Sequence, residues 1–288
     1  MKVSKIILIA SLLLFSVTVK TKAQSFWSVY LGLGTTWYYG DLNDRVIIHP
    51  DLLEFGGQVG VMYNFSPKLG ARLNYLHGGV SGADSLAKSE DYQARNLSFL
   101  SNIDEISLQL VFRPFNFGRV TPYLFAGGGA FHFNPKAEFL GEEIELQLVG
   151  TEGQYINEAG YPTPYDLWVV SVPLGIGVNF AISPRLDLGL EAGYHKLFTD
   201  YLDDVSTVYP EMDKLAATPA GPLAVALSDR GTVARLPFST RGNDASDGFG
   251  HLFLTLTYHF GRGDSNSSRG VGGRGKRGSK MDSGCYGL

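Results

Sequence analysis

Apolar side chains recur at every second position in eight segments of the chain, which is the pattern of β-strands with one apolar and one polar face. In residues 27–39 the odd positions are mostly apolar or aromatic, and the even positions are mostly small or polar. The alternation is clearest in residues 168–180 and least distinct in the glycine-rich segment 123–133. The eight predicted strands cover residues 27–39, 55–65, 69–75, 105–113, 123–133, 168–180, 185–194 and 252–260.

The connections between these segments alternate in length. Three short ones, of about 3 to 7 residues, separate four long ones of about 15 to 52 residues. Transmembrane β-barrels have short periplasmic turns and long extracellular loops, and an even strand number leaves both termini in the periplasm. The predicted outward rows also lack charges, which would cost about 2–4 kcal/mol at mid-membrane. We therefore predict an all-β protein, an eight-stranded up-and-down transmembrane β-barrel with long extracellular loops in the outer membrane.

Aromatic residues at the ends of the apolar rows predict two girdles at the membrane surfaces. Trp27 and Trp37 lie ten residues apart. At ~3.3 Å per residue and a tilt of ~40° this spacing spans ~25 Å, the height of an outer-membrane apolar band. Tyr258 and Phe260 end the last strand and are expected to face outward at the periplasmic girdle. The partner expected for these rows is outer-membrane lipid.

Pro173 interrupts the pattern of the sixth predicted strand. Every strand of a closed barrel is central, and a proline cannot donate a hydrogen bond to the ladder. We predict a β-bulge at this position. The alternative is an earlier end to the strand, which leaves the number of strands unchanged.

The two ends of the chain differ from its body. Residues 1–23 join a basic start to an apolar run that is too short for a comfortable membrane helix, which predicts a secretory signal peptide. Residues 24–260 are the predicted barrel domain. Residues 261–288 hold six Lys or Arg and two Asp, a charge of +4, among many Gly and Ser. This composition predicts a flexible basic tail in the periplasm.

Composition excludes two classes of protein. The chain is 44% hydrophobic with 36 glycines, but no apolar run after residue 23 is long enough for a membrane helix, which excludes a helical membrane protein. The formal charge of −4 becomes −8 once the four lysines of the signal peptide are removed. The body therefore lacks the basic surface of a nucleic-acid-binding protein.

Charged and polar residues on the inward face predict a plug. The interior of an eight-stranded barrel is just wide enough for side chains to fill it. We expect a set of mutually satisfied polar side chains rather than a conducting pore, with Glu191 and Gln109 higher in the barrel and the others near the periplasmic end. The predicted plug residues are Arg72, Gln109, Arg113, Arg185, Asp187 and Glu191.

The sequence predicts no catalytic residues and no small-molecule substrate. His77 and His195 are expected at the extracellular rim, where some small outer-membrane barrels place catalytic groups, but no serine is paired with either by spacing. The glycines of residues 127–129 lie in a strand pattern and open no helix, so they do not predict a phosphate loop.

An acidic motif follows the seventh predicted strand. Its residues Asp200, Asp203 and Asp204 could in principle bind a hard cation, but their spacing matches no calcium loop. We expect a solvated acidic loop, and no metal or other cofactor.

Three segments resemble one family of barrels. They are residues 35–42 (TTWYYGDL), residues 122–127 with 131–135 (PYLFAG and FHFNP), and residues 198–206 (FTDYLDDVS), the last being the most distinctive. Over roughly residues 24–260 the chain is similar to the PorG-like outer-membrane proteins of the type IX secretion system. The resemblance implies a non-enzymatic part of a protein secretion and gliding motility apparatus. It also implies partners, a periplasmic ring of PorK- and PorN-like proteins that the barrel ties to the outer membrane. A stand-alone small barrel, either a passive envelope protein or a lipid-modifying enzyme, is the alternative.

The single cysteine, Cys285, lies near the end of the predicted tail. An exposed thiol in the oxidising periplasm is expected to pair with another molecule. Relatives of the PorG type end in a basic segment that carries a cysteine, so the resemblance implies a disulfide to the ring lipoprotein. A mixed disulfide, a homodimer and a free thiol are the alternatives.

Overall fold

A computed structural model describes residues 25–42, 49–231, 234–243 and 245–260 of the 288-residue chain. The predicted signal peptide and the tail with Cys285 lie outside these residues. No helix in the described ranges is long and apolar enough to cross a membrane. The strands are β1 (Phe26–Tyr39), β2 (Glu54–Asn64), β3 (Leu69–Ala83), β4 (Ser98–Phe112), β5 (Val120–Phe139), β6 (Glu142–Glu145), β7 (Trp168–Ser183), β8 (Leu186–Leu197) and β9 (Gly248–His259). The helices are η1 (Pro50–Leu52), η2 (Asp84–Leu86), α2 (Glu90–Arg95), α3 (Leu146–Val149), α4 (Met212–Ala216) and α5 (Gly221–Ser228).

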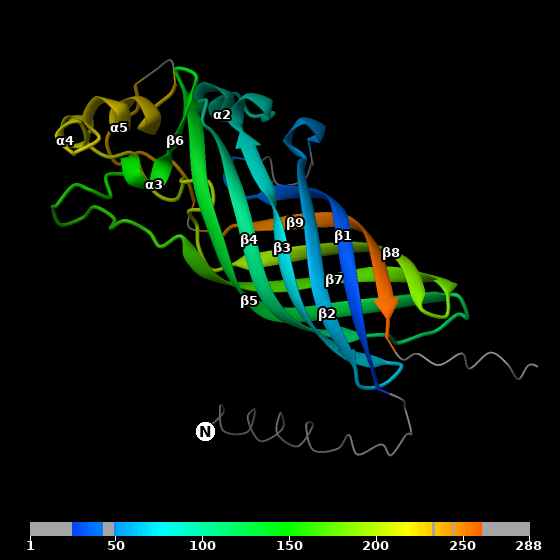
Figure 1. Ribbon diagram of the computed structural model, residues 1–288. Coiled ribbons are helices and arrows are strands. Elements are labelled where there is room, and N and C mark those ends of the chain that lie inside the picture. The colour runs from blue at the N-terminus through cyan, green and yellow to red at the C-terminus, as the bar shows by residue number, and fades with distance from the viewer. Residues whose placement is uncertain (1–24, 43–48, 232–233, 244, 261–288) are drawn as a thin grey trace, which may run out of the picture.

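Eight of these strands, all except β6, form one closed antiparallel barrel (Figure 1). β1 pairs with β2 on one edge and with β9 on the other, so that Leu31 lies opposite both Val59 and Leu256. Pairing of β4 with β5 completes the circle. The predicted number of strands and their up-and-down order are therefore confirmed. We call the end with the three short turns the turn end, and the opposite end the cap end.

The predicted alternation of faces is also observed. In β4, the outward Ile106, Leu108 and Leu110 are 52%, 63% and 59% exposed, whereas Ser107 and Gln109 between them are 1% exposed. The same exposure of apolar side chains continues around the barrel through β1, β2, β7, β8 and β9. The outer surface is therefore a continuous apolar belt, and the polar side chains are gathered inside.

Three strands extend well beyond their predicted ends, by six or more residues. β3 continues from Tyr75 to Ala83, β4 begins at Ser98 rather than Glu105, and β5 continues from Phe133 to Phe139. The added residues pair with one another, as Ala83 does with Ser98. They were missed because these strand ends are covered by connections, so that alternation of apolar and polar residues is no longer required of them.

The predicted bulge at Pro173 is wrong, and so is an early end to the strand. Pro173 lies within β7 and pairs in register with His195 of β8, and the irregularity of that ladder lies further along, between Ala181 and Ser183. On the other edge of β7, the two residues between Ser171 and Leu174 do not pair with β5. The register of the β5–β7 ladder is the same before and after this gap. The missing proline N–H is tolerated because the ladder is already open there.

The long connections between β3 and β4, β5 and β7, and β8 and β9 fold together as a cap over one end of the barrel (Figure 1). Helices α2 to α5 and the β5–β6 hairpin belong to this cap. The buried side chains of the cap form a single apolar cluster with strand residues that point into the barrel at its cap end. Members from the strands include Leu76, Ile103, Phe131, Leu197, Phe249 and Phe253, and members from the connections include Leu146, Leu202, Leu215 and Leu227.

Candidate functional site

A buried ion pair crosses the barrel interior. The Arg72 guanidinium lies 2.7 Å from Oε2 of Glu191, and only 5% and 0% of the two side chains are exposed. Arg72 belongs to β3 and Glu191 to β8, four strands apart in the eight-stranded circle, so the pair joins opposite walls. Removing one partner of such a buried pair strongly destabilises the protein, because the remaining buried charge then has no counter-charge.

Three neutral side chains complete the hydrogen bonding of this pair. Arg72 Nε donates to Gln109 at 2.7 Å, while Gln58 Nε2 and the Tyr123 hydroxyl donate to Glu191 at 2.8 and 2.6 Å. The cavity in this layer measures about 10 Å³. That is at the lower limit of the space that one water molecule needs. Side chains therefore fill the lumen at this depth and leave no open channel.

A second polar cluster lies on the cap side of this pair. His195 Nδ1 lies 2.7 Å from Oε2 of Glu105, and His195 Nε2 lies 3.0 Å from Nδ1 of His251. His195, predicted at the extracellular rim, lies two residues before the cap end of β8, but it points into the lumen and is completely buried. The reason is parity: His195 is four residues beyond Glu191 in the same strand, so both face the lumen. His77, in contrast, is on the outer face beside Asp104, at 2.9 Å.

The remaining predicted plug residues lie nearer the turn end. Asp187 is buried and lies 2.9 Å from Nε2 of His259. Arg113 is half-buried immediately beyond the end of β4 and lines the cavity that Arg72 also lines. Arg185 does not belong to the plug. It lies exposed in the β7–β8 turn, because β8 begins one residue later than predicted.

The predicted girdle residues lie on the outer surface at the two ends of the belt. Near the turn end, Trp27 packs on Tyr63 with ring centroids 4.9 Å apart, and Tyr258 packs on Phe260 at the same distance. Trp37 lies at the other end of β1, partly buried against its neighbours. The aromatic rings thus flank the apolar rows at both ends.

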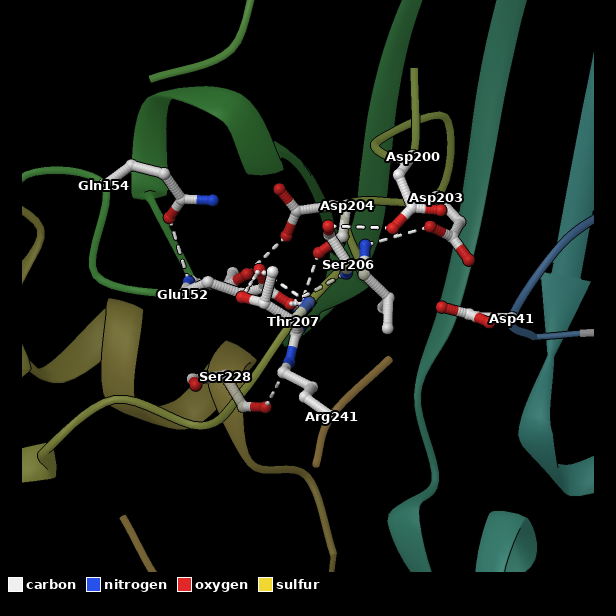
Figure 2. Close-up of polar contacts among 12 residues, drawn as sticks. Asp41, Glu152, Gln154, Asp200, Asp203, Asp204, Ser206, Thr207, Ser228 and Arg241 are labelled. Carbon is white, nitrogen blue, oxygen red and sulfur yellow. Dashed lines mark hydrogen bonds and ion pairs between the residues drawn. The ribbon is translucent and has the colours of Figure 1, made fainter. Parts of the chain in front are cut away.

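A polar anchor holds the cap together around Glu152 (Figure 2). The Glu152 carboxylate accepts hydrogen bonds from Arg241 at 3.0 Å and from the backbone N–H groups of Ser206 and Thr207 at 2.9 and 3.1 Å. Asp200 accepts a further bond from the Ser206 hydroxyl at 2.8 Å. These contacts join the connection before β7 to the one before β9.

The acidic motif belongs to the same anchor, and the prediction that it is a solvated loop is wrong. Asp203 and Asp204 are 1% and 0% exposed. Asp203 accepts a hydrogen bond from the Tyr38 hydroxyl at 2.5 Å, and Asp204 accepts one from Tyr165 at 2.7 Å. Asp203 thereby ties the cap to the end of β1. The motif is buried because apolar neighbours such as Leu202 are drawn into the cap core.

Burial changes the titration of these carboxyl groups. It raises the pKa of Asp204 to about 6, an effect that the nearby Arg241 partly opposes. Burial also raises the pKa values of Asp203 and Asp247 well above the ordinary range; the nearby Asp41 adds to the shift of Asp203, and Asp203 adds to that of Asp247. In the described part of the chain, no three His, Cys, Asp or Glu side chains are arranged to hold a metal ion. The arrangement favours a structural anchor whose strength depends on pH.

The comparisons with known proteins agree with this architecture. A model of the outer membrane protein beta-barrel domain matches residues 7–209, more than half of the chain. The chain belongs to this family. No curated protein matches the sequence.

Solved structures of small barrels are similar to the chain in fold alone. Neisserial surface protein A has a TM-score of 0.41 at 9% identity, and covers 82% of this chain and 97% of its own. Ail of Yersinia pestis has a TM-score of 0.40 at 12% identity, with 82% and 99% covered. A major outer membrane protein of Thermus thermophilus has a TM-score of 0.40 at 15% identity, also with 82% and 99% covered. The family places this barrel in the outer membrane, where its apolar belt faces lipid.

Several residues that make buried polar contacts in this outer-membrane barrel were not predicted from the sequence. Gln58 shares the inward face of its strand, so its parity could have assigned it to the plug. The cap ion pairs Arg95–Asp84 and Arg241–Glu152 join residues 11 and 89 positions apart in the connections between strands. No periodicity in the sequence indicates such pairs.

Proposed function

We propose that this chain is a non-enzymatic barrel subunit of a type IX secretion and gliding apparatus, which anchors a periplasmic ring of PorK- and PorN-like proteins to the outer membrane. The similarity of residues 198–206 to the PorG-like proteins supports this assignment. The observation that carries the non-conducting part is the Arg72–Glu191 layer, which fills the lumen. The non-enzymatic part rests on the resemblance alone. A barrel without an open lumen acts through its outer surface, its loops or its ends.

The proposal includes an orientation, with the cap outside the cell and both ends of the chain in the periplasm. Short periplasmic turns and long extracellular loops are the rule for such barrels. The tip of the β5–β6 hairpin, where Leu140 is 90% exposed, would then be accessible on intact cells. The turn at Lys68 would not.

Isolation of the protein with its partners tests the proposed role. A tag inserted at the exposed Leu140 tip leaves both ends of the chain free, and the tagged barrel is purified from outer membranes. We expect a ring lipoprotein to co-purify, partly as a heavier band on non-reducing gels that collapses on reduction. Cys285→Ser should remove that band, and Ser283→Ala, two residues away, should retain it. A barrel that purifies alone under gentle extraction and cross-linking would refute the ring assignment.

A stand-alone lipid-modifying barrel is the second candidate, and one cluster on the outer face favours it. Asp104 accepts a hydrogen bond from Tyr75 at 2.6 Å and lies 2.9 Å from His77. A histidine oriented by a carboxylate is a common general base. If this candidate is correct, His77→Ala will alter the lipid A of the cells while leaving barrel assembly intact, and unchanged lipid A will exclude it.

A further inference from the structure

An aromatic groove lies on the outer face of the barrel at the cap end. It is lined by Trp37 and Tyr39 of β1, Tyr194 of β8, and Asn243 and Ser246 of the segment that leads into β9. Its volume is about 530 Å³. The groove is large enough for part of a lipid headgroup, whereas the cavity in the Arg72–Glu191 layer of the lumen measures about 10 Å³.

Two glycines of β9 make this groove possible. A Cβ atom at Gly250 would lie 2.4 Å from Cε2 of Trp37, and one at Gly248 would lie 2.5 Å from the Tyr194 hydroxyl oxygen. Both rings therefore lie directly on the β9 backbone. Tyr39 bridges them, with its ring centroid 6.3 Å from that of Trp37 and 5.7 Å from that of Tyr194. The rings meet edge to face, with interplanar angles of 77° and 62°, and together form one contiguous aromatic floor rather than a set of separate girdle residues.

A positive charge lies beside this floor. Lys196 is two residues beyond Tyr194 and therefore shares its outward face, and its ammonium donates to the Ser246 carbonyl at 2.8 Å. A lysine ammonium has three donors, so two are available to another acceptor. Asp247 lies nearby, but it is 1% exposed and its raised pKa favours the neutral form. The exposed edge of the groove thus presents a cation.

The position of the groove decides what can occupy it. On the turn side it continues into the apolar belt, where Leu33 and Leu252 are 48% and 43% exposed. A molecule in the groove must therefore have a polar part beside the aromatic floor and acyl chains along the belt. Aromatic side chains are concentrated at this depth of a membrane, where their rings meet headgroups.

We propose that the groove binds the phosphorylated amino-sugar headgroup of a glycolipid of the outer leaflet. The sugar ring packs on the faces of Trp37 and Tyr194, because aliphatic C–H groups carry partial positive charge and ring faces are negative. The phosphate pairs with Lys196 as a point charge. This inference depends on the proposed orientation, which places the cap end in the outer leaflet.

Trp37 provides a direct reporter, because the chain contains three tryptophans, Trp27, Trp37 and Trp168. Trp27→Phe combined with Trp168→Phe leaves Trp37 as the single fluorophore. The barrel is placed in phosphatidylcholine nanodiscs with increasing mole fractions of diphosphorylated lipid A. We expect a saturable change in Trp37 emission. Lys196→Gln should raise the half-saturating fraction about fivefold, since one basic residue near an anionic membrane surface contributes about that factor.

Three controls make the test decisive. Trp168 is 60% exposed on the outer face of β7, outside the groove. Trp27→Phe combined with Trp37→Phe leaves Trp168 as the single fluorophore and also removes Trp37 from the groove, so this variant should show no saturable change and reports any general response to the lipid. Lys136→Gln, a substitution in the cap, should leave the half-saturating fraction unchanged. Phosphatidylglycerol should not replace lipid A. Equal responses of the two tryptophans, equal responses to the two lipids, or no effect of Lys196→Gln would each overturn the proposal.

The orientation is tested separately, so the two failures are distinguishable. Nanodiscs carry the same lipid on both faces, and binding there does not depend on which end is outside. Surface labelling at Leu140 on intact cells reads the orientation alone. Specific lipid A binding with labelling at Leu140 supports the proposal. Labelling at Lys68 instead would assign the groove to the inner leaflet and overturn the glycolipid as its occupant.

Discussion

Removal of the Glu191 carboxylate tests whether the lumen is held by the ion pair. Glu191→Leu leaves the Arg72 guanidinium buried without a counter-charge, and removes the acceptor of Gln58 and Tyr123. Breaking a buried pair costs about 3–5 kcal/mol, and each orphaned neutral donor costs about 1–3 kcal/mol. Because these losses occur in one network and are not additive, we expect the free energy of unfolding to fall by about 5 kcal/mol.

The double variant Arg72→Met/Glu191→Leu separates the charge effect from the loss of packing. It removes both charges together and replaces them with apolar groups of similar size, a change that is often neutral or stabilising in buried pairs. We expect its stability to lie between that of wild type and that of either single variant. Because the double variant then loses less stability than either single variant, the coupling energy between the two positions should be at least as large as the larger single loss, about 5 kcal/mol.

Equilibrium urea unfolding from lipid vesicles measures these differences, with tryptophan emission and the mobility of unboiled protein on gels as probes. The exposed pair Lys136–Glu143, at 3.3 Å with 26% and 63% of the side chains exposed, offers a matched control. Glu143→Leu should change stability by at most about 1 kcal/mol. If Glu191→Leu is no worse than this control, or if the double variant equals the sum of the singles, the ion pair does not hold the lumen as described.

Other predictions concern the cap and the last strand. Because the folded pKa of Asp204 is raised to about 6, the cap binds a proton more readily when folded. Its stability should be greatest below about pH 4 and fall as pH rises through 6, and Asp204→Asn should flatten this dependence in proteolysis assays from pH 4 to 8. Replacing Tyr258 and Phe260 with Asp should abolish membrane insertion, as read by outer-membrane protein levels, because both would place charges at the girdle. Normal levels of that variant would contradict the assigned end of β9, and an unchanged pH profile for Asp204→Asn would contradict the buried carboxyl.

The strand number and the faces of the strands were predictable because both are local properties. The alternation of apolar and polar residues can be recognised within a single segment. The exposed Leu108 beside the buried Gln109 shows that this alternation corresponds to the outer and inner faces of the barrel. Parity also predicted that Arg72, Gln109 and Glu191 share the interior. The same rule, applied to His195, would have placed it in the lumen as well.

The pairing inside the lumen and the fold of the cap were decided only by the tertiary structure. Arg72 meets Glu191 because closure and register bring opposite walls to the same depth, and neither is visible in one strand. The acidic motif is buried because the connections before β7 and before β9 meet around Glu152 and Arg241, whose attraction acts across 89 residues of sequence. Alternation encodes the orientation of a side chain relative to its own backbone. A partner on another element is determined only when the whole chain has closed around it.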